Sequence, residues 1–429
     1  MTSPTDITRV DAWQAFDSRG TPTVAARVWV SGGASATGIA PAGASTGHFE
    51  AFELRDGGDP FGGMGVDLAV ANVRHHLGPA IVGQDATDQR SIDESLVAAD
   101  GTPRGQSLGA NALLSVSIAV ANVAVAATQT PLWERLFHDT ACLPLPMVNI
   151  VSGGAHAAGM IDIQDVLAVP VGAADVRSAL RMVWDVRRST ADVLESRGFS
   201  TALVADEGGL AAPLASNEHA LEVVSRGIEA AGLGLGSDVS IAIDVAANSM
   251  RVGRSYRFRQ TGDVLDADGW LSVIEGWIDR YPVVSIEDPF ADDDDVGWRT
   301  CAERLLAKVQ LVGDDRFATD LELLEQGITE RSANSLLVKP NQNGTLSGAS
   351  DVLCRAQRAG WSPVVSARSG DTEQSWLADF AVGWGAGQIK VGSLQRSERT
   401  SKWNRLLELA ATTDLPYAGA SALAPSPSP

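Results

Sequence analysis

The feature that most constrains the fold is a repeated pattern between residues 240 and 390. A short apolar run of strand character ends in a charged or polar residue, and a polar connection of helical character follows it. The runs lie at 240–244, 283–287, 309–314, 335–339, 363–366 and 387–390. The first four are spaced by roughly 25–45 residues, which is the length of a strand–helix unit. Runs this apolar suit strands buried on both faces of a parallel sheet, and a ring of such strands is a barrel.

The strand ends of this expected barrel carry charged residues. Three successive ends carry Asp244, Glu287 and Asp314, and later ends carry Lys339 and Lys390. The chemistry of a barrel of this kind is found where its strands end. Three converging carboxylates favour a hard divalent cation, most simply Mg²⁺. A lysine beside that cation is a candidate base.

A simpler interpretation has to be weighed, because an acidic residue after a strand is often only the N-cap of the next helix. The metal-site prediction therefore depends on five charged residues sharing one register. Lysine usage supports it. The chain has four lysines, Lys308, Lys339, Lys390 and Lys402, and arginine carries nearly all other positive charge. Lysine can give up its proton in a suitable environment and arginine cannot, and two of the four lysines stand at strand ends.

Composition bounds the class of protein. A chain of 429 residues exceeds one ordinary core, so two domains are expected. The net charge of −20 argues against nucleic acid or an anionic membrane as a partner. The three scattered cysteines favour a reduced cytoplasmic protein. We expect no signal peptide and no membrane span, since the run at 110–127, which comes nearest, is diluted by Ala, Ser and Asn.

Turn and linker signals divide the chain. Two strands around a turn are expected at 7–30, a mobile small-residue loop at 38–47, and helices at 67–82, 91–99 and 108–121. Two prolines at 144 and 146 mark a boundary. We therefore expect an α+β domain over 1–142, a barrel over 143–421, and a disordered Ser/Pro tail over 422–429.

The barrel domain opens with features of its own. A strand at 147–151 precedes a Gly-rich loop at 152–157, which carries His156 with little to pack against. A strand at 162–169 and a helix at 174–197 follow. The acidic pair Asp206-Glu207 then stands before two glycines, at the reactive end of the expected barrel.

Motifs along essentially the whole chain resemble the enolase family. They are DSRG at 17–20, GASTG at 43–47, GANA at 109–112, GG at 153–154, DEGG at 206–209, SIEDPF at 285–290, GDD at 313–315 and RSER at 396–399. The resemblance implies an N-terminal α+β domain followed by a modified (β/α)₈ barrel, assembled as a dimer or a ring of dimers. It implies Mg²⁺-dependent interconversion of 2-phosphoglycerate and phosphoenolpyruvate, with a small phosphorylated acid as the partner molecule.

The resemblance also implies residue roles. Asp244, Glu287 and Asp314 match the family's metal ligands, Lys339 its base, and Glu207 the acid that protonates the leaving hydroxyl. The substrate contacts implied are Arg368 and Ser369 to phosphate and Lys390 to carboxylate. His156 and Ser45 lie on loops that close over the substrate, and Ser45 can meet a second Mg²⁺. Asp165, a further catalytic candidate, stands where the family has Glu.

Several positions depart from the family pattern. Ala367 replaces a site histidine, and Asp165 is one methylene shorter than the family's glutamate. The other departures are Ala42, Asn248-Ser249-Met250, Arg316, Asp320, Pro340 and Asn343. One alternative is a paralogue that resembles carboxyphosphonoenolpyruvate synthase of phosphonate antibiotic pathways, since loss of a histidine would make room for a larger phosphorus substituent. A second alternative is a catalytically inactive binding protein on the same fold.

Overall fold

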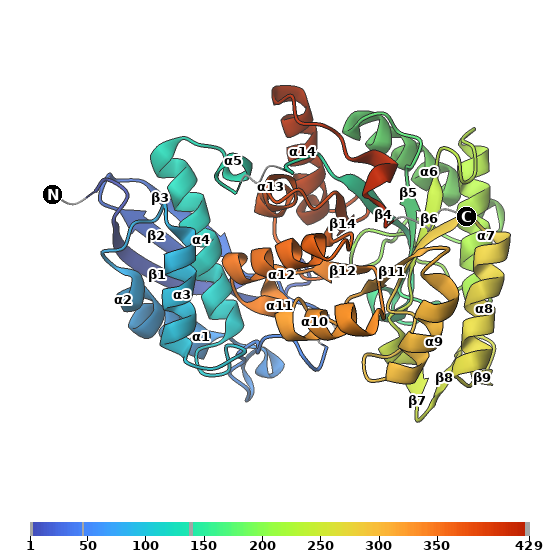
Figure 1. Ribbon diagram of the computed structural model, residues 1–429, viewed down its shortest axis with the longest axis horizontal. Helices are drawn as coiled ribbons and strands as arrows, with labels where there is room; N and C mark the ends of the chain where they lie inside the picture. Colours follow the sequence, from blue (N-terminus) through green and yellow to red (C-terminus); the bar gives the residue numbers. More distant parts are fainter. Residues whose placement is uncertain (1–2, 45–46, 137–139, 425–429) are drawn as a thin grey trace.

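The computed structural model describes residues 3–44, 47–136 and 140–424, and Figure 1 shows a smaller N-terminal part beside a larger barrel. The N-terminal part contains an antiparallel sheet with strand order β1-β2-β3. Its strands are β1 (Ile7–Phe16), β2 (Pro22–Val30) and β3 (Ser35–Ile39). The two strands expected at 7–30 are present, and β3 extends the sheet by one strand.

The helices of this part follow the sheet along the chain, and most of them pack on it. They are α1 (Asp67–Asn72), η2 (Val73–Leu77), α2 (Gly78–Ile81), α3 (Gln89–Asp100), α4 (Ala110–Thr128) and α5 (Leu132–Arg135). The small residues of α4 let it pack directly on β2 and β3. At Gly38 in β3, an added Cβ would lie 2.3 Å from the carbonyl oxygen of Ser115 in α4, so glycine is required there.

The expectation that no run is long enough to cross a membrane needs correction at α4. By length and hydropathy this helix could span a bilayer, but 78% of its apolar window is buried inside the protein. Its apolar surface is therefore used in packing between the sheet and its neighbours.

The second part is a closed barrel with the strand order β10-β11-β12-β13-β14-β4-β5-β6. Its strands are β4 (Leu145–Ser152), β5 (Asp165–Val169), β6 (Ser240–Asp244), β10 (Val283–Glu287), β11 (Gln310–Gly313), β12 (Ser335–Val338), β13 (Val364–Ser366) and β14 (Gln388–Gly392). All six runs of the repeated pattern are barrel strands, which confirms the predicted α/β class.

One strand departs from the expected parallel ring. β5 runs antiparallel to both of its neighbours, β4 and β6. Its first residue, Asp165, pairs with Ser152 at the end of β4 and with Asp244 at the end of β6. The reversed direction therefore brings the beginning of β5, rather than its end, to the reactive end of the barrel.

Helices surround the barrel, and three short strands lie at its edge (Figure 1). The helices are α6 (Val176–Ser196), α7 (Asn217–Ala230), α8 (Ala267–Arg280), α9 (Asp295–Leu305), α10 (Leu321–Glu330), α11 (Pro340–Asn343), α12 (Leu346–Arg358), α13 (Trp376–Gly383) and α14 (Ser397–Thr412). The short strands are β7 (Arg251–Val252), β8 (Ser255–Arg257) and β9 (Val264–Leu265). Most of the buried apolar residues lie between barrel and helices, in one continuous core.

The chain after α14 closes the other end of the barrel. Residues Gly419–Ala422 form a short 3₁₀ turn, and Ala424 is buried. The Ala424 amide donates to Gln310 Oε1 at 2.9 Å, and Gln388 Nε2 donates to the Ala422 carbonyl at 3.0 Å. The expectation of disorder from residue 422 is therefore wrong for 422–424, because these residues satisfy polar groups in the barrel floor. Residues 425–429 lie outside the described part.

The N-terminal part meets the barrel at its reactive end. Helices α11 and α12 pack against α4, and α12 also contacts α3. The segment after β3 reaches the barrel through paired main-chain bonds between Ala42 and Gly370, 2.8 and 2.9 Å long, and a bond of 2.8 Å from Ala51 to Gln342. This docking brings N-terminal residues to the mouth of the barrel.

Candidate active site

The predicted metal and lysine residues stand at one end of the barrel. Asp244 and Glu287 are the last residues of β6 and β10, Asp314 and Lys339 directly follow β11 and β12, and Lys390 lies within β14. The helices after β6, β10 and β11 are capped by other aspartates, namely Asp266, Asp294 and Asp320. The simpler interpretation of these acids as N-caps is therefore excluded.

Lys390 lies between two of the carboxylates. Its ammonium donates to Asp244 Oδ2 at 2.7 Å and to Glu287 Oε2 at 2.6 Å. Gln164 Nε2 also donates to Asp244 Oδ2, at 3.1 Å. Burial and the neighbouring Asp244 raise the pKa of Glu287 well above its usual range, and Lys390 offsets only part of this. Two buried carboxylates thus share one ammonium, so the position between them suits a cation.

Asp314 is held by a different lysine. One oxygen pairs with the Lys339 ammonium, and Oδ1 accepts from Gln342 Nε2 at 2.9 Å. Burial raises the pKa of Asp314, but Lys339 and Arg368 outweigh burial and lower it. The backbone amide of Asp314 donates to Asp288 Oδ1 at 2.8 Å, which fixes the turn after β11.

The three predicted ligands do not converge on a single point in this state. Among the described residues, two groups bring three ligand atoms within 4.8 Å of one another, His156/Asp165/Glu207 and Asp288/Asp314/Asp315. The predicted set instead spans two adjacent cation positions, one at Lys390 and one at Lys339. The donors are all buried carboxylate oxygens and outnumber the lysines, so their chemistry fits Mg²⁺.

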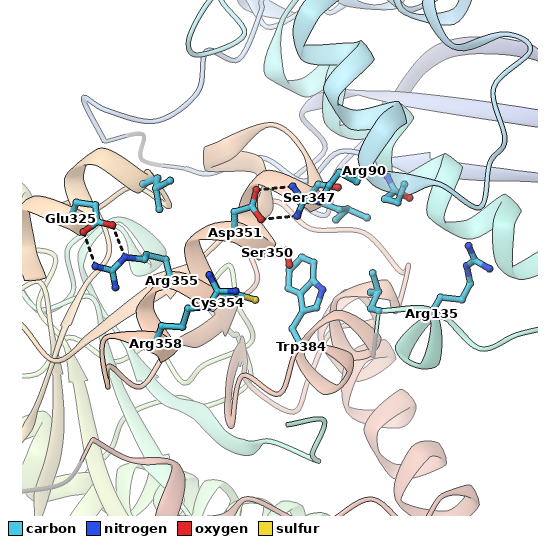
Figure 2. Close-up of a pocket in the computed structure, with 14 residues that line it drawn as sticks. Arg90, Arg135, Glu325, Ser347, Ser350, Asp351, Cys354, Arg355, Arg358 and Trp384 are labelled. Atoms are coloured by element: carbon cyan, nitrogen blue, oxygen red, sulfur yellow. Dashed lines mark hydrogen bonds and ion pairs between the residues drawn. The ribbon is translucent and has the colours of Figure 1, made fainter. Parts of the chain in front are cut away.

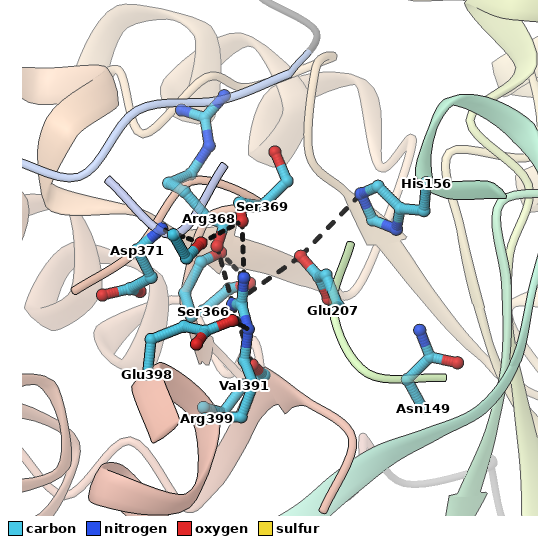
Figure 3. Close-up of polar contacts among 12 residues, drawn as sticks. Asn149, His156, Glu207, Ser366, Arg368, Ser369, Asp371, Val391, Glu398 and Arg399 are labelled. Atoms are coloured by element: carbon cyan, nitrogen blue, oxygen red, sulfur yellow. Dashed lines mark hydrogen bonds and ion pairs between the residues drawn. The ribbon is translucent and has the colours of Figure 1, made fainter. Parts of the chain in front are cut away.

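A second cluster faces the site from β4, β5 and the loop before α7. Asp165 Oδ2 pairs with His156 Nδ1 at 2.9 Å, and Oδ1 accepts from Ser152 Oγ at 3.0 Å and from the Asn149 amide. His156 Nε2 lies 3.8 Å from Glu207 Oε1, and Figure 3 shows these two side chains pointing toward one another. The expectation that His156 has little to pack against is wrong, because Gly154–Ala157 forms a 3₁₀ turn and the His156 side chain is only 9% exposed.

The charges of this cluster follow from its surroundings. Burial lowers the pKa of His156, but Asp165 and Glu207 outweigh burial and raise it to about 9. Burial raises the pKa of Glu207, but His156 and Arg399 outweigh burial and lower it. At neutral pH in this state, His156 therefore carries the proton and Glu207 is ionised.

Arg368 and Ser369 lie on the loop after β13. Arg368 is buried and donates to Glu50 at 2.9 and 3.2 Å and to Asn341 Oδ1 at 3.0 Å. Ser369 Oγ accepts from the Ala44 amide at 2.7 Å. The predicted phosphate contacts are thus held by residues of the N-terminal part. Ser45 lies outside the described residues.

The side chains enclose a small polar cavity of about 30 Å³, with room for about two water molecules. Its walls include His156, Glu207, Lys339, Arg368 and Lys390, so the structure brings residues from both predicted halves of the site together. Ala367 forms part of the wall at the position of the family histidine. Of the other departures, Asn248 donates to Asp315 Oδ2 at 2.9 Å, while Asp320 caps α10.

Sequence reasoning missed the residues that hold the predicted ones. They are Glu50, Asn149, Ser152, Gln164, Asn341 and Gln342. Gln342 also donates to Glu50 Oε1 at 3.3 Å, so α11 links the Asp314 side of the site to the Arg368 side. The only signal for them in the sequence was their position, because Gln164, Asn341 and Gln342 stand within three positions of a predicted site residue.

A larger hollow lies away from the strand ends. It measures about 540 Å³ and lies between α3 and α5 on one side and α10, α12 and Trp384, which directly follows α13, on the other (Figure 2). Two of its arginines are paired, Arg90 with Asp351 at 2.7 Å and Arg355 with Glu325 at 2.5 Å. None of the predicted site residues lines it, so size alone does not identify the active site.

Comparison with known families agrees with this architecture. Residues 7–136 match the family model described as "Enolase, N-terminal domain", and residues 140–425 match the one described as "Enolase, C-terminal TIM barrel domain". The two matches cover almost the whole chain, and the second corresponds to the closed barrel that carries the carboxylates and lysines. This chain belongs to the enolase family and is an enzyme of the enolase superfamily.

Proposed function

We propose that this enzyme is a Mg²⁺-dependent lyase that interconverts 2-phosphoglycerate, or a close relative, and a phosphoenolpyruvate-type product. The observation that carries the proposal is that one cavity joins the two predicted halves of the site. Its walls hold both lysines and two of the three predicted metal ligands together with Glu207 and His156, and Lys390 also pairs with Glu287. The reaction removes the proton α to a carboxylate, moves the electron pair into that carboxylate, and then expels the β-hydroxyl as water.

The metal site of the proposal consists of Asp244, Glu287 and Asp314. When bound, Mg²⁺ supplies concentrated positive charge, which makes a doubly negative enolate intermediate tolerable. Lys390 contributes a further positive charge, because burial lowers its pKa but Asp244 and Glu287 outweigh burial and raise it well above the usual range. We assign Lys390 to the substrate carboxylate, where the intermediate's charge develops.

Lys339 is the proposed base. Burial lowers its pKa, Asp314 raises it more strongly, and Arg368 and Lys390 act in the lowering direction. Lys339 is therefore protonated in this structure. It can act as a base only when the negative charge of Asp314 is neutralised by another group. Because Asp314 raises the pKa of Lys339 while Arg368 and Lys390 lower it, this pKa depends on the net charge of the site.

The proposed acid is Glu207, acting with His156 and Asp165. His156 holds the proton in this state, and its Nε2 lies 3.8 Å from Glu207 Oε1, which is beyond a direct hydrogen bond, so a proton passes between them through one water or after the two groups move closer. Asp165 fixes the ring by binding Nδ1. Arg368 and Ser369 also line the cavity and offer a guanidinium and a hydroxyl for the phosphate.

The test is turnover of 2-phosphoglycerate with Mg²⁺, followed by the absorbance of the enol product. Lys339→Met should abolish exchange of the α-proton with solvent deuterium as well as turnover. Glu207→Gln should stop elimination but retain α-proton exchange, because only the second step needs the acid. Loss of exchange in Glu207→Gln together with normal exchange in Lys339→Met would contradict the assignment.

Ala367 favours a second candidate, the carboxyphosphonoenolpyruvate synthase-like reaction. A methyl group occupies the cavity wall where the family has an imidazole, which leaves room for a larger phosphorus substituent. This candidate predicts that the wild type turns over 2-phosphoglycerate slowly or not at all, and that Ala367→His increases this activity. Efficient dehydration by the wild type would contradict it.

A further inference from the structure

The RSER motif at 396–399 has no role in the proposed reaction, yet its last residue is among the largest fully buried side chains of the described chain. Arg399 is the third residue of α14 and is 0% exposed. Figure 3 shows its guanidinium beneath the loop that carries Arg368 and Ser369, with Glu207 beside it. A buried charge is costly unless it is paired and hydrogen-bonded, so its partners matter.

The guanidinium binds three main-chain carbonyls. Nη1 donates to the carbonyl of Arg368 at 2.7 Å and to that of Val391 at 3.1 Å, and Nη2 donates to that of Ser369 at 2.6 Å. Arg368 and Ser369 are the proposed phosphate contacts, and Val391 directly follows Lys390. One side chain therefore ties together the ends of β13 and β14, which an arginine can do because its donors form a rigid fork.

The same guanidinium approaches the proposed acid. Nη1 lies 3.9 Å from Glu207 Oε1, and Nε lies 3.4 Å from Glu398 Oε1. The Glu207 carbonyl accepts from the Ser393 amide at 2.8 Å, so the acid loop is fastened to the chain after β14. At Gly392, with φ at +105°, a Cβ would lie 3.0 Å from Arg399 Cδ and 2.9 Å from the Glu207 carbonyl oxygen. There is thus no space for a side chain at Gly392 between Arg399 and Glu207.

We propose that Arg399 is a positioning residue that sets the spacing between the phosphate-binding loop, Lys390 and Glu207. It touches no reacting atom; it acts through main-chain carbonyls on one side and through the Glu207 carboxylate on the other. Its role in catalysis rests on the proposed function, whereas its role in holding the loop does not.

If Arg399 only stabilised the fold, its replacement would lower stability without releasing the loop. The same helix supplies a matched control for that case. Arg405 in α14 is a partly buried arginine, unlike the fully buried Arg399, and it pairs with Asp379 at 2.9 and 2.7 Å. Its ion pairs, to Asp379 in α13 and to Glu408 in α14, involve none of the three segments that Arg399 joins. Arg405→Lys therefore weakens α14 packing without releasing the loop.

The experiment compares Arg399→Lys, Arg399→Met and Arg405→Lys in the full chain. Amide hydrogen exchange reports the loop directly, because the amides of Ala367 and Gly370 bond to the carbonyls of Lys390 and Ala42. Both Arg399 variants should exchange these amides at least tenfold faster, and Arg405→Lys should not. With 2-phosphoglycerate and Mg²⁺, Arg399→Lys should raise KM and lower kcat at least tenfold, with a further loss in Arg399→Met.

The outcomes separate the two proposals. If Arg399→Lys lowers only the unfolding midpoint, as Arg405→Lys does, and leaves exchange and kinetics unchanged, the inference is overturned. If Arg399→Met does not fold, Arg399→Lys decides alone, since it keeps the charge and loses the fork. If the wild type does not turn over 2-phosphoglycerate but exchange accelerates in Arg399→Lys, the positioning of the loop is supported and dehydration of 2-phosphoglycerate is rejected as the function.

Discussion

The charge on His156 gives the sharpest test of the site, because it changes stability in a defined pH window. Burial alone would lower the pKa of this imidazole, and the ion pairs with Asp165 and Glu207 raise it to about 9 from 6.5. A group whose pKa is raised on folding stabilises the folded state while it is protonated. This stabilisation is complete below pH 6.5 and is lost as the pH rises through 9.

The magnitude follows from the size of the rise in pKa. A rise from 6.5 to about 9 corresponds to about 3 kcal/mol of unfolding free energy at acidic pH. The same relation leaves about 2 kcal/mol at pH 7.5 and almost nothing above pH 9.5. His156→Gln removes this contribution and adds a pH-independent packing change.

The assay is urea unfolding of the wild type and His156→Gln at matched pH values from 5.5 to 10. We expect the difference in unfolding free energy to shrink by about 3 kcal/mol across that range, with most of the change between pH 7 and 9. Asp165→Asn in the wild type should reduce this pH-dependent change in unfolding free energy, because it removes the carboxylate that binds His156 Nδ1. His76→Gln, at an exposed position outside the cluster, serves as the histidine control.

The result that would refute this reasoning is a difference that stays constant from pH 6 to 9.5, or one that grows as the pH rises. A constant difference would mean that folding leaves the pKa of His156 unchanged, and a growing one would mean that folding lowers it, so in both cases His156 would be mostly neutral at pH 7.5. The proton relay proposed for Glu207 would then lose its donor.

Three further predictions concern the buried charges. Lys390→Met leaves Asp244 and Glu287 without their shared ammonium, so we expect the free energy of unfolding, measured with urea in EDTA, to fall by about 3–5 kcal/mol. Unchanged stability would show that the carboxylates are not both ionised. Glu50→Gln removes the ion pair with Arg368, so we expect the free energy of unfolding to fall by about 1.5–3 kcal/mol. An unaltered urea midpoint would disprove this. Mg²⁺ at 100 times its dissociation constant should stabilise the wild type by about 2.7 kcal/mol over NaCl of equal ionic strength. Asp244→Asn should abolish this gain, and a gain of equal size in that variant would place the ion elsewhere.

The barrel and its reactive end could be predicted because their signals are local. A strand buried on both faces leaves an apolar run, and the charged residue that ends the run must lie where the strand leaves the barrel. Asp244, Glu287 and Lys339 could be placed by this rule before any contact was known. The order of residues 422–424 could not be predicted, because this Ala-Leu-Ala segment leads into a Ser/Pro stretch and gives no sign that the barrel floor offers buried partners such as Gln310.

The partners of the site residues depend on contacts between distant segments. Glu50 and Arg368 are 318 residues apart, and they meet only because the N-terminal part docks on α11. Asp165 reaches the site through the reversed direction of β5, and a strand of five residues shows no direction in its composition. Strand polarity and domain docking are properties of the whole fold, so residue patterns did not reveal them.

The sequence by itself determined the family, the strand ends and the kinds of charge placed there, because each of these follows from residue type and spacing along the chain. Only the tertiary structure decided which charges pair, that Lys390 serves two carboxylates while Lys339 serves Asp314, and that His156 rather than Glu207 holds the proton. The physical reason is that protonation depends on burial and on distances to other charges, which exist only once segments far apart in the chain have come together.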